Sequence, residues 1–250
     1  MSSSSSTTAA AGKTMVLFGA TGNTGKYFLP AALAAGWRVT AFLRTPSKVA
    51  DAAGLTKVKG DLTKPADVAD VIQGADVVVC LAGVPRGTKP GGRMDGFMTK
   101  AMKDIVAAME QHGVRRLMFQ VGGFTLLQGE PKTGCFAACC IRDCVLGKCM
   151  GEAVSLRENQ VIAEFLETKR ATIDWTLPRP GMLEHKDTKG TVVGSPTSTQ
   201  DTCAFVDLAA WEVTLLDDDA TIHTGPFPTY DKTATTAGNP SAAAVGESKD

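Results

Sequence analysis

The stretch MVLFGATGNTGKYFLPAALAAG, residues 15–36, constrains the fold of this chain more than any other. An apolar run leads directly into three glycines at a spacing of three, Gly19, Gly22 and Gly25, and an alanine-rich segment follows. Gly19 can adopt the tight exit from a strand, Gly22 leaves room for a phosphate, and Gly25 lets a helix pack closely on the strand. Because the N-terminus of that helix would point free amides at the turn, the pattern predicts a pyrophosphate site.

Short apolar runs and helix-like segments alternate along the rest of the chain, as they do in a parallel sheet that is covered by helices. The run DVVVCL at 76–81 is typical of a central strand buried on both faces. The expected strands cover residues 14–18, 37–43, 55–59, 75–81, 115–121 and 172–177, and the expected helices cover 24–35, 97–112, 154–168 and 206–216. The sequence therefore predicts an α/β protein with a single Rossmann-like, doubly wound parallel sheet and helices on both faces.

The folded domain is expected to occupy residues 14–231. The leader at 1–13 is rich in Ser, Thr and Ala, and the tail at 232–250 is small and polar, so both are predicted to be disordered because neither can bury enough apolar surface to fold. The leader has no apolar signal-peptide core, so we expect a cytoplasmic protein. Organelle targeting by the Ser- and Ala-rich leader is the alternative.

Charge and hydropathy restrict the partners of the domain. Lysine and arginine number 26 and balance 26 aspartates and glutamates, so no net basic field favours a nucleic acid. No apolar stretch reaches the roughly 18 residues that span a bilayer. We therefore expect a small-molecule substrate and neither a nucleic-acid nor a membrane partner.

The end of the second predicted strand selects the dinucleotide. NAD-binding proteins hold the ribose hydroxyls with an acidic residue at this point, whereas this chain has Arg44 there and no carboxylate between Gly25 and Asp51. The planar guanidinium group suits a 2′-phosphate. We therefore predict NADPH in preference to NADH; the alternative is that Arg44 is simply a solvated residue at a strand end.

Several segments resemble one known group of proteins. GATGNTG at 19–25, KGDLTKPADV at 59–68 and VVVCLAG at 77–83 resemble the atypical short-chain dehydrogenases/reductases of the NmrA-like group. Within that group, IVAAMEQHGVRRLMFQ at 105–120, FTLL at 124–127 and HTGPFPTY at 223–230 are similar to the flavin reductase, or biliverdin reductase B, branch. The likeness covers residues 14–230 and is stronger in the cofactor half than in the substrate half.

This resemblance implies a set of site residues. The implied cofactor contacts are Gly19, Thr21, Gly22, Asn23, Thr24, Gly25, Arg44, Asp61, Leu62, Ala82, Gly83 and Arg86. The candidates for the substrate pocket are Gly122, Gly123, Phe124, Pro180, Gly181, Met182 and His185. Ordinary backbone geometry is the alternative explanation for the glycines and prolines.

The chain departs from the group at the residues that would transfer a proton. Short-chain dehydrogenases use a tyrosine with a lysine four residues later, but neither of the two tyrosines here, Tyr27 and Tyr230, has one. The group's tyrosine and lysine positions are occupied by Leu156 and Gln160. At the strand exit where the flavin-reductase branch has a serine, this chain has Gly122 and Gly123, and the histidine of that branch falls at about Gly181. The catalytic residues therefore stay unassigned.

Two functions remain open on the sequence. A flavin such as FMN, or a linear tetrapyrrole, can be reduced without a protein proton donor when it is held against the nicotinamide, which favours an NADPH-dependent reductase. The alternative is a non-catalytic NADPH sensor of the NmrA-like type, in which cofactor occupancy controls a protein partner. A third hypothesis, redox or metal sensing, rests on the cysteines Cys135, Cys139, Cys140, Cys144 and Cys149, but their spacing is not that of a zinc site, and we predict no metal.

Overall fold

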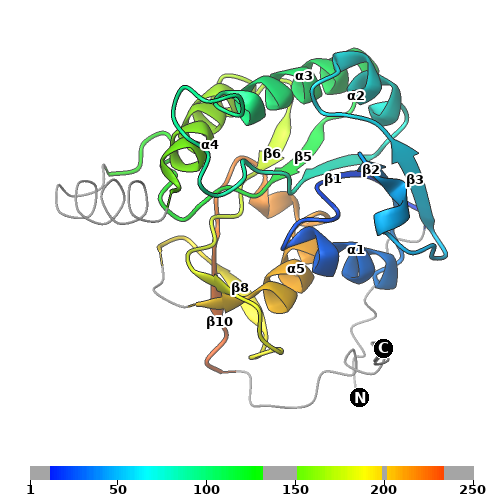
Figure 1. Ribbon diagram of the computed structural model, residues 1–250. Coiled ribbons are helices and arrows are strands. Elements are labelled where there is room, and N and C mark those ends of the chain that lie inside the picture. Colours follow the sequence, from blue (N-terminus) through cyan, green and yellow to red (C-terminus); the bar gives the residue numbers. More distant parts are fainter. Residues whose placement is uncertain (1–11, 132–150, 199–201, 234–250) are drawn as a thin grey trace.

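The computed structural model describes residues 12–131, 151–198 and 202–233, and a parallel sheet of six strands forms its centre (Figure 1). Neighbouring strands follow the order β3-β2-β1-β4-β5-β6. The six strands are β1 (Thr14–Phe18), β2 (Arg38–Leu43), β3 (Leu55–Lys59), β4 (Val77–Cys80), β5 (Arg116–Phe119) and β6 (Asp174–Thr176). The six predicted strands and the doubly wound parallel class are therefore confirmed.

Helices cover both faces of this sheet, as the alternating pattern predicts (Figure 1). Helices α1 (Gly25–Ala34) and α5 (Phe205–Thr214) pack together on one face, and α2 (Pro65–Ile72), α3 (Phe97–His112) and α4 (Ala153–Glu167) lie on the other. The four predicted helices begin and end within two residues of these bounds. Helix α2 was not predicted, since it has only eight residues and two buried side chains, Val68 and Ile72.

Two small sheets flank the main one and were not predicted. Strand β7 (Leu183–Glu184) pairs with β9 (Cys203–Ala204), and β8 (Val192–Ser195) pairs antiparallel with β10 (Phe227–Tyr230). Two short 3-10 helices, η1 (Pro46–Lys48) and η3 (Asp219–Thr221), complete the regular structure of the described residues. Segments this short leave no periodic pattern that distinguishes them from loops.

The strand order places a crevice at one end of the sheet. Strand β1 lies between β2 and β4, so the chain continues from β1 in one direction toward β3 and later in the other toward β6. Loops that leave neighbouring parallel strands in opposite directions open a crevice at the carboxyl ends of those strands. The glycine turn after β1 lies at this point.

Some expectations fall outside the described residues. Most of the predicted leader at 1–13 and tail at 232–250 lies there, and so does the cysteine cluster from Cys135 to Cys149. Within the described part of the chain, no helix is long and apolar enough to cross a bilayer, and no three His, Cys, Asp or Glu side chains are grouped as a metal site would require.

Candidate functional site

The three glycines of the turn are held by close backbone contacts. Gly19 has a φ of +87°, and a Cβ there would lie 2.5 Å from the backbone nitrogen of Ala82. A Cβ at Gly25 would overlap the carbonyl oxygen of Gly19. Gly22 differs, because its φ is not in the left-handed region and a Cβ would lie 3.1 Å from the Gly19 carbonyl oxygen and 3.8 Å from that of Leu81. Gly19 and Gly25 are therefore required by the turn itself, whereas a side chain at Gly22 needs only a small shift of the Gly19 carbonyl.

Free backbone amides converge at this turn. Thr24 is buried and immediately precedes α1, and the Gly22 N–H donates to the Gly19 carbonyl at 2.9 Å. The N–H groups of Asn23, Thr24 and Gly25 find no acceptor within the part of the chain that the structure describes. Together with the dipole of α1, three successive free donors form a site for an anion such as a pyrophosphate.

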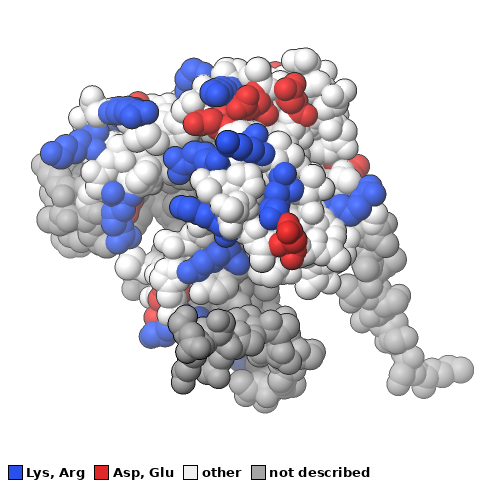
Figure 2. All heavy atoms as spheres, turned by 45° about the vertical axis from the view of Figure 1, so that its right-hand side comes forward, with Lys and Arg blue, Asp and Glu red and all other residues white. Residues whose placement is uncertain are grey.

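The exits of β2 and β3, on one side of the turn, carry exposed positive charge. Arg44 follows the last residue of β2 and is exposed, as is Lys64 beyond β3. Hydrogen bonds from Thr63 are the main cause that lowers the pKa of Asp61, and the charges of Arg44 and Lys64 lower it further, so these three groups are neighbours. Lys and Arg side chains gather in the middle of the face drawn in Figure 2. Leu62 packs partly against the core.

The β4 exit borders the turn on its other side. Ala82 touches Gly19 and is partly packed into the core, whereas Gly83 has open space where a side chain would be. Arg86 lies farther along this loop and its Nε donates to Glu152 at 2.7 Å. The Gly87 N–H also donates to the carbonyl of Gly151 at 3.0 Å, so the loop is fastened to the start of α4.

The exits of β5 and β6 meet beside each other. The Val121 and Gly123 N–H groups donate to the carbonyls of Pro178 and Pro180 at 3.0 and 2.8 Å. Gly123 is close to that strand exit, with a Cβ position 3.1 Å from the Pro180 oxygen, whereas Gly181 faces open space. The structure thus brings the pocket candidates of the two strand exits together, from Gly122 to Phe124 and from Pro180 to Met182, and leaves Met182 55% exposed.

Arg179 holds this junction together and was missed in the sequence. Its side chain is 2% exposed, and its guanidinium group donates to the carbonyls of Gly225 and Thr125 at 2.6 and 3.0 Å. Two further bonds of 2.6 and 2.7 Å go to both carboxylate oxygens of Glu130, and Phe227 covers the group at 4.0 Å. A bidentate pair of this kind, with a buried guanidinium group and a Glu130 side chain that is 30% exposed, fixes the loops after β5 and β6. An arginine between two prolines gave no signal of this role.

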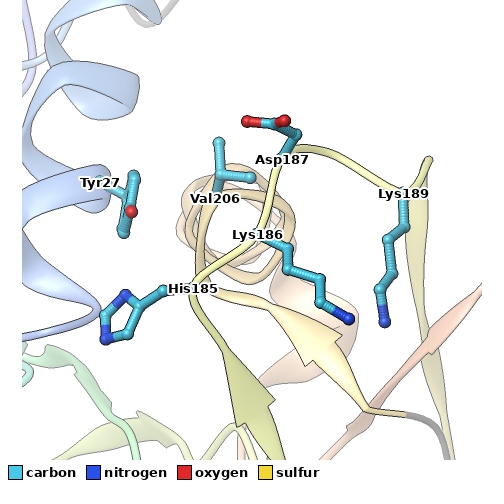
Figure 3. Close-up of a pocket in the computed structure, with 6 residues that line it drawn as sticks. All are labelled: Tyr27, His185, Lys186, Asp187, Lys189 and Val206. Carbon is cyan, nitrogen blue, oxygen red and sulfur yellow. The ribbon is translucent and has the colours of Figure 1, made fainter.

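His185 lies in a hollow of about 550 Å³ between α1 and the loop after β7 (Figure 3). Its ring stacks on Phe205 at a centroid distance of 4.5 Å, and Tyr27 of α1 stacks on the same phenylalanine at 6.5 Å. In Figure 3 the rings of Tyr27 and His185 lie on one side, and Lys186 and Lys189 lie on the other. His185 is thus brought to the first turn of α1, where phosphates are expected; its contact with a substrate stays a prediction.

Asp207 of α5 positions the wall of this hollow. Its buried carboxylate accepts hydrogen bonds from the Thr188 hydroxyl, from the Lys189 N–H at 2.8 Å and from the Tyr230 hydroxyl at 2.9 Å. Burial is the main cause that raises the pKa of Tyr230, so its hydroxyl is protonated and acts as a donor. Tyr230 is therefore a structural residue of this loop and not a proton relay.

Helix α4 offers no proton relay at the positions implied by the resemblance. The Gln160 carboxamide accepts from the Leu126 N–H at 2.9 Å and donates to the Leu126 carbonyl at 3.1 Å. The nearby Glu158 is 2% exposed and accepts from the N–H groups of Gly96 and Thr99 at the start of α3, at 3.0 and 2.7 Å. Both side chains are engaged in hydrogen bonds with backbone groups, and the Leu156 side chain cannot ionise, so none of the three residues is available as a proton donor.

The two described cysteines are expected to be inert to alkylation. Burial raises the pKa of Cys80 to about 12 and that of Cys203 to about 11. At pH 8 only about one Cys80 thiol in ten thousand would be ionised, and the thiolate is the reactive form. Iodoacetamide added to the native protein should leave the peptides with Cys80 and Cys203 unmodified in a mass spectrum and label both after unfolding in guanidinium. If either cysteine of the folded protein were labelled as fast as in the unfolded chain, this prediction would be wrong.

The crevice at the strand-order reversal, the glycine turn and the free amides before α1 define a dinucleotide-binding α/β protein. The model of the NAD(P)H-binding family matches residues 19–219, and this chain belongs to that family. The match shows a nicotinamide cofactor without resolving NADPH from NADH.

Similar proteins include several reductases and an epimerase-like structure. A 2-alkyl-3-oxoalkanoate reductase of Shewanella oneidensis is 31% identical over 121 residues, which are 46% of this chain and only 30% of that relative. ChuY, an anaerobillin reductase from Escherichia coli O157:H7, superimposes with a TM-score of 0.67 at 20% identity, over 90% of this chain and 100% of that one. A putative epimerase from Bacteroides thetaiotaomicron gives 0.70 at 20% identity, over 89% and 99%. At this identity the structural likenesses show the fold alone.

Proposed function

We propose that this protein is an NADPH-dependent reductase that transfers a hydride to a small planar acceptor, either a flavin or a linear tetrapyrrole. The observation that carries the proposal is the junction of the β5 and β6 exits beside the predicted nicotinamide end. There Gly181 has no atom within 4 Å of a Cβ position, a Cβ at Gly122 would meet only the amide nitrogen of Asn159 at 3.5 Å, and Gly123 lets the two strand exits pack closely. The missing side chains at Gly122 and Gly181 favour a flat acceptor ring at this junction.

The lack of a proton relay fits this class of acceptor. The bound nicotinamide would supply a hydride, which carries two electrons, and an acceptor such as FMN takes it at a ring nitrogen while water supplies the second proton. The protein then needs only to hold the two rings in contact. Reduction of a simple ketone would depend more strongly on a general acid. Neither residue at the expected positions provides one, because Gln160 is hydrogen-bonded to backbone groups of Leu126 and Leu156 is apolar.

The proposal is tested by following NADPH consumption by the full-length protein with and without added FMN, and with NADH in parallel. Saturable consumption that depends on FMN and prefers NADPH would support a reductase. The reductases among the similar proteins favour this outcome, although the sequence match to the first of them spans less than a third of its length.

A non-catalytic NADPH sensor is the second candidate. The absence of a proton donor at Leu156 and Gln160 of α4 is as compatible with a sensor as with a reductase. In that case the protein would bind NADPH without consuming it in the presence of FMN or of a tetrapyrrole. Cofactor occupancy would then control a protein partner, in line with the resemblance to the NmrA-like group.

Replacing Arg44 by alanine is expected to weaken NADPH binding about tenfold or more, because charge-assisted hydrogen bonds contribute roughly 1.5–3 kcal/mol each. NADH, which has no 2′-phosphate, should bind with nearly unchanged affinity. Dissociation constants from nucleotide fluorescence would measure both. The matched control is Arg38→Ala, which removes another exposed arginine at the opposite end of β2. Equal losses for both nucleotides would rule out a contact between Arg44 and the 2′-phosphate.

A further inference from the structure

One polar side chain of α4 reaches the β5 exit, and it is neither Leu156 nor Gln160. A Cβ placed on Gly122 would lie 3.5 Å from the amide nitrogen of Asn159. Gly122 lies at the β5 exit, which together with Gly123 is the predicted acceptor side of the site, so Asn159 is a side chain of α4 that borders the predicted acceptor.

Asn159 differs from its neighbours because nothing in the described chain occupies its carboxamide. Glu158 binds the start of α3, Gln160 binds both backbone groups of Leu126, and Arg157 pairs with Asp95. No hydrogen bond to the Asn159 side chain occurs within residues 12–131, 151–198 and 202–233. These neighbouring bonds fasten α4 on both sides of Asn159, so a half-buried carboxamide is held at the strand exit with its donors and acceptor unused by the described residues.

We propose that Asn159 binds the acceptor through a lactam edge, in which a carbonyl group and an N–H group lie side by side. A carboxamide can donate and accept at once, so it matches such an edge with two hydrogen bonds. The pyrimidine ring of a flavin and the terminal rings of a linear tetrapyrrole both carry this edge, whereas a simple quinone has carbonyl groups alone. This inference rests on the proposed reductase function and narrows its substrate class.

The test compares variants that remove one or both halves of the hydrogen-bonding pair. Asn159→Leu keeps the approximate size and neither donates nor accepts, and Asn159→Asp only accepts when ionised. The matched control is Val161→Ala, which changes a residue of the same helix that is 39% exposed. Each protein is assayed with NADPH and FMN, and with NADPH and menadione, a planar quinone without an N–H group. FMN binding to the NADP⁺-loaded protein is measured by flavin fluorescence.

Both Asn159 variants should lose about tenfold in kcat/KM for FMN, mostly through KM. Leucine removes both hydrogen bonds, and an ionised aspartate removes the donor and places a carboxylate against the acceptor's carbonyl oxygen. FMN binding should weaken by a similar factor. Turnover with menadione, NADPH affinity and the control variant should change by less than about threefold, whereas a merely structural role of Asn159 would impair both acceptors alike.

Two results would overturn the inference and separate it from the proposed function. If the unaltered protein reduces or binds FMN and both variants match it, Asn159 does not bind the acceptor while the reductase proposal stands. If the unaltered protein reduces menadione but neither reduces nor binds FMN or a linear tetrapyrrole, the lactam edge is wrong, while NADPH-dependent hydride transfer to a planar acceptor stands. Absence of turnover and of FMN binding in the unaltered protein would overturn both.

Discussion

Replacing Arg179 by methionine is expected to lower the free energy of unfolding by about 3 kcal/mol, because two buried carbonyl groups and a partly buried carboxylate lose their donor. Methionine keeps much of the length of the side chain but donates no hydrogen bond. The carbonyl groups of Gly225 and Thr125 and the carboxylate of Glu130 would all lose their donor. Urea denaturation followed by circular dichroism would measure the change.

The matched control is Arg115→Met. Arg115 also pairs with one carboxylate through two nitrogens, bonding Asp174 at 3.0 and 2.9 Å, but its side chain is 53% exposed. Solvent screens such a pair, so this variant should unfold at nearly the urea concentration of the unaltered protein. Equal stability losses in the two variants would show that burial does not set the strength of the Arg179 pair.

Acid provides a second readout of the same pair. Burial opposes ionisation of Glu130, but hydrogen bonds from Arg179 and from the Leu127 N–H outweigh it and lower the pKa of that carboxyl. A group whose pKa is lower in the folded than in the unfolded state stabilises the fold above its ordinary pKa, and this contribution disappears as the pH falls through the lowered value. The stability difference between the unaltered protein and Arg179→Met should therefore shrink on acidification.

The elements with long periodic or uninterrupted apolar patterns were predictable from the sequence. Helix α3 has the bounds 97–112 that its apolar spacing predicts, and Met98, Met102 and Met109 on its inner face are all buried. The run from Val77 to Cys80 is a fully buried central strand. Burial of one face of the helix, or of both faces of the strand, requires apolar residues at many positions. The resulting pattern can therefore be recognised in a single sequence.

The contacts that shape the site were not predictable in this way. Arg179, Asp207 and Gln160 each bind backbone groups that are 18 or more residues away in the chain. Such bonds leave no periodicity, because any loop that presents a carbonyl or N–H group at the right place satisfies them. The resemblance placed Leu156 and Gln160 at the group's tyrosine and lysine positions and left the catalytic residues unassigned, and it gave no sign that Asn159 is the α4 side chain beside Gly122.

Replacing Gly22 by valine is expected to weaken the binding of NADPH and NADH alike by a large factor while the protein stays folded. The side chain would project at the turn where Asn23, Thr24 and Gly25 present free N–H groups, and it would displace the pyrophosphate from them. Losing two charge-assisted hydrogen bonds, at roughly 1.5–3 kcal/mol each, would weaken binding about 100-fold or more. Gly22→Ala, with a smaller side chain, should show an intermediate loss. Isothermal titration calorimetry with each nucleotide would measure the affinities.

Gly22 is the informative member of the three glycines. Substitutions at Gly19, with its φ of +87°, or at Gly25, whose Cβ would overlap the Gly19 carbonyl, would disrupt the turn itself and confuse unfolding with loss of the site. The matched control is Gly194→Ala in β8, where a Cβ would make an ordinary contact of 3.4 Å with Pro226. It should bind both nucleotides normally. If Gly22→Val is folded by circular dichroism and still binds NADPH with full affinity, the glycine turn does not hold the phosphates, and the cofactor must lie elsewhere.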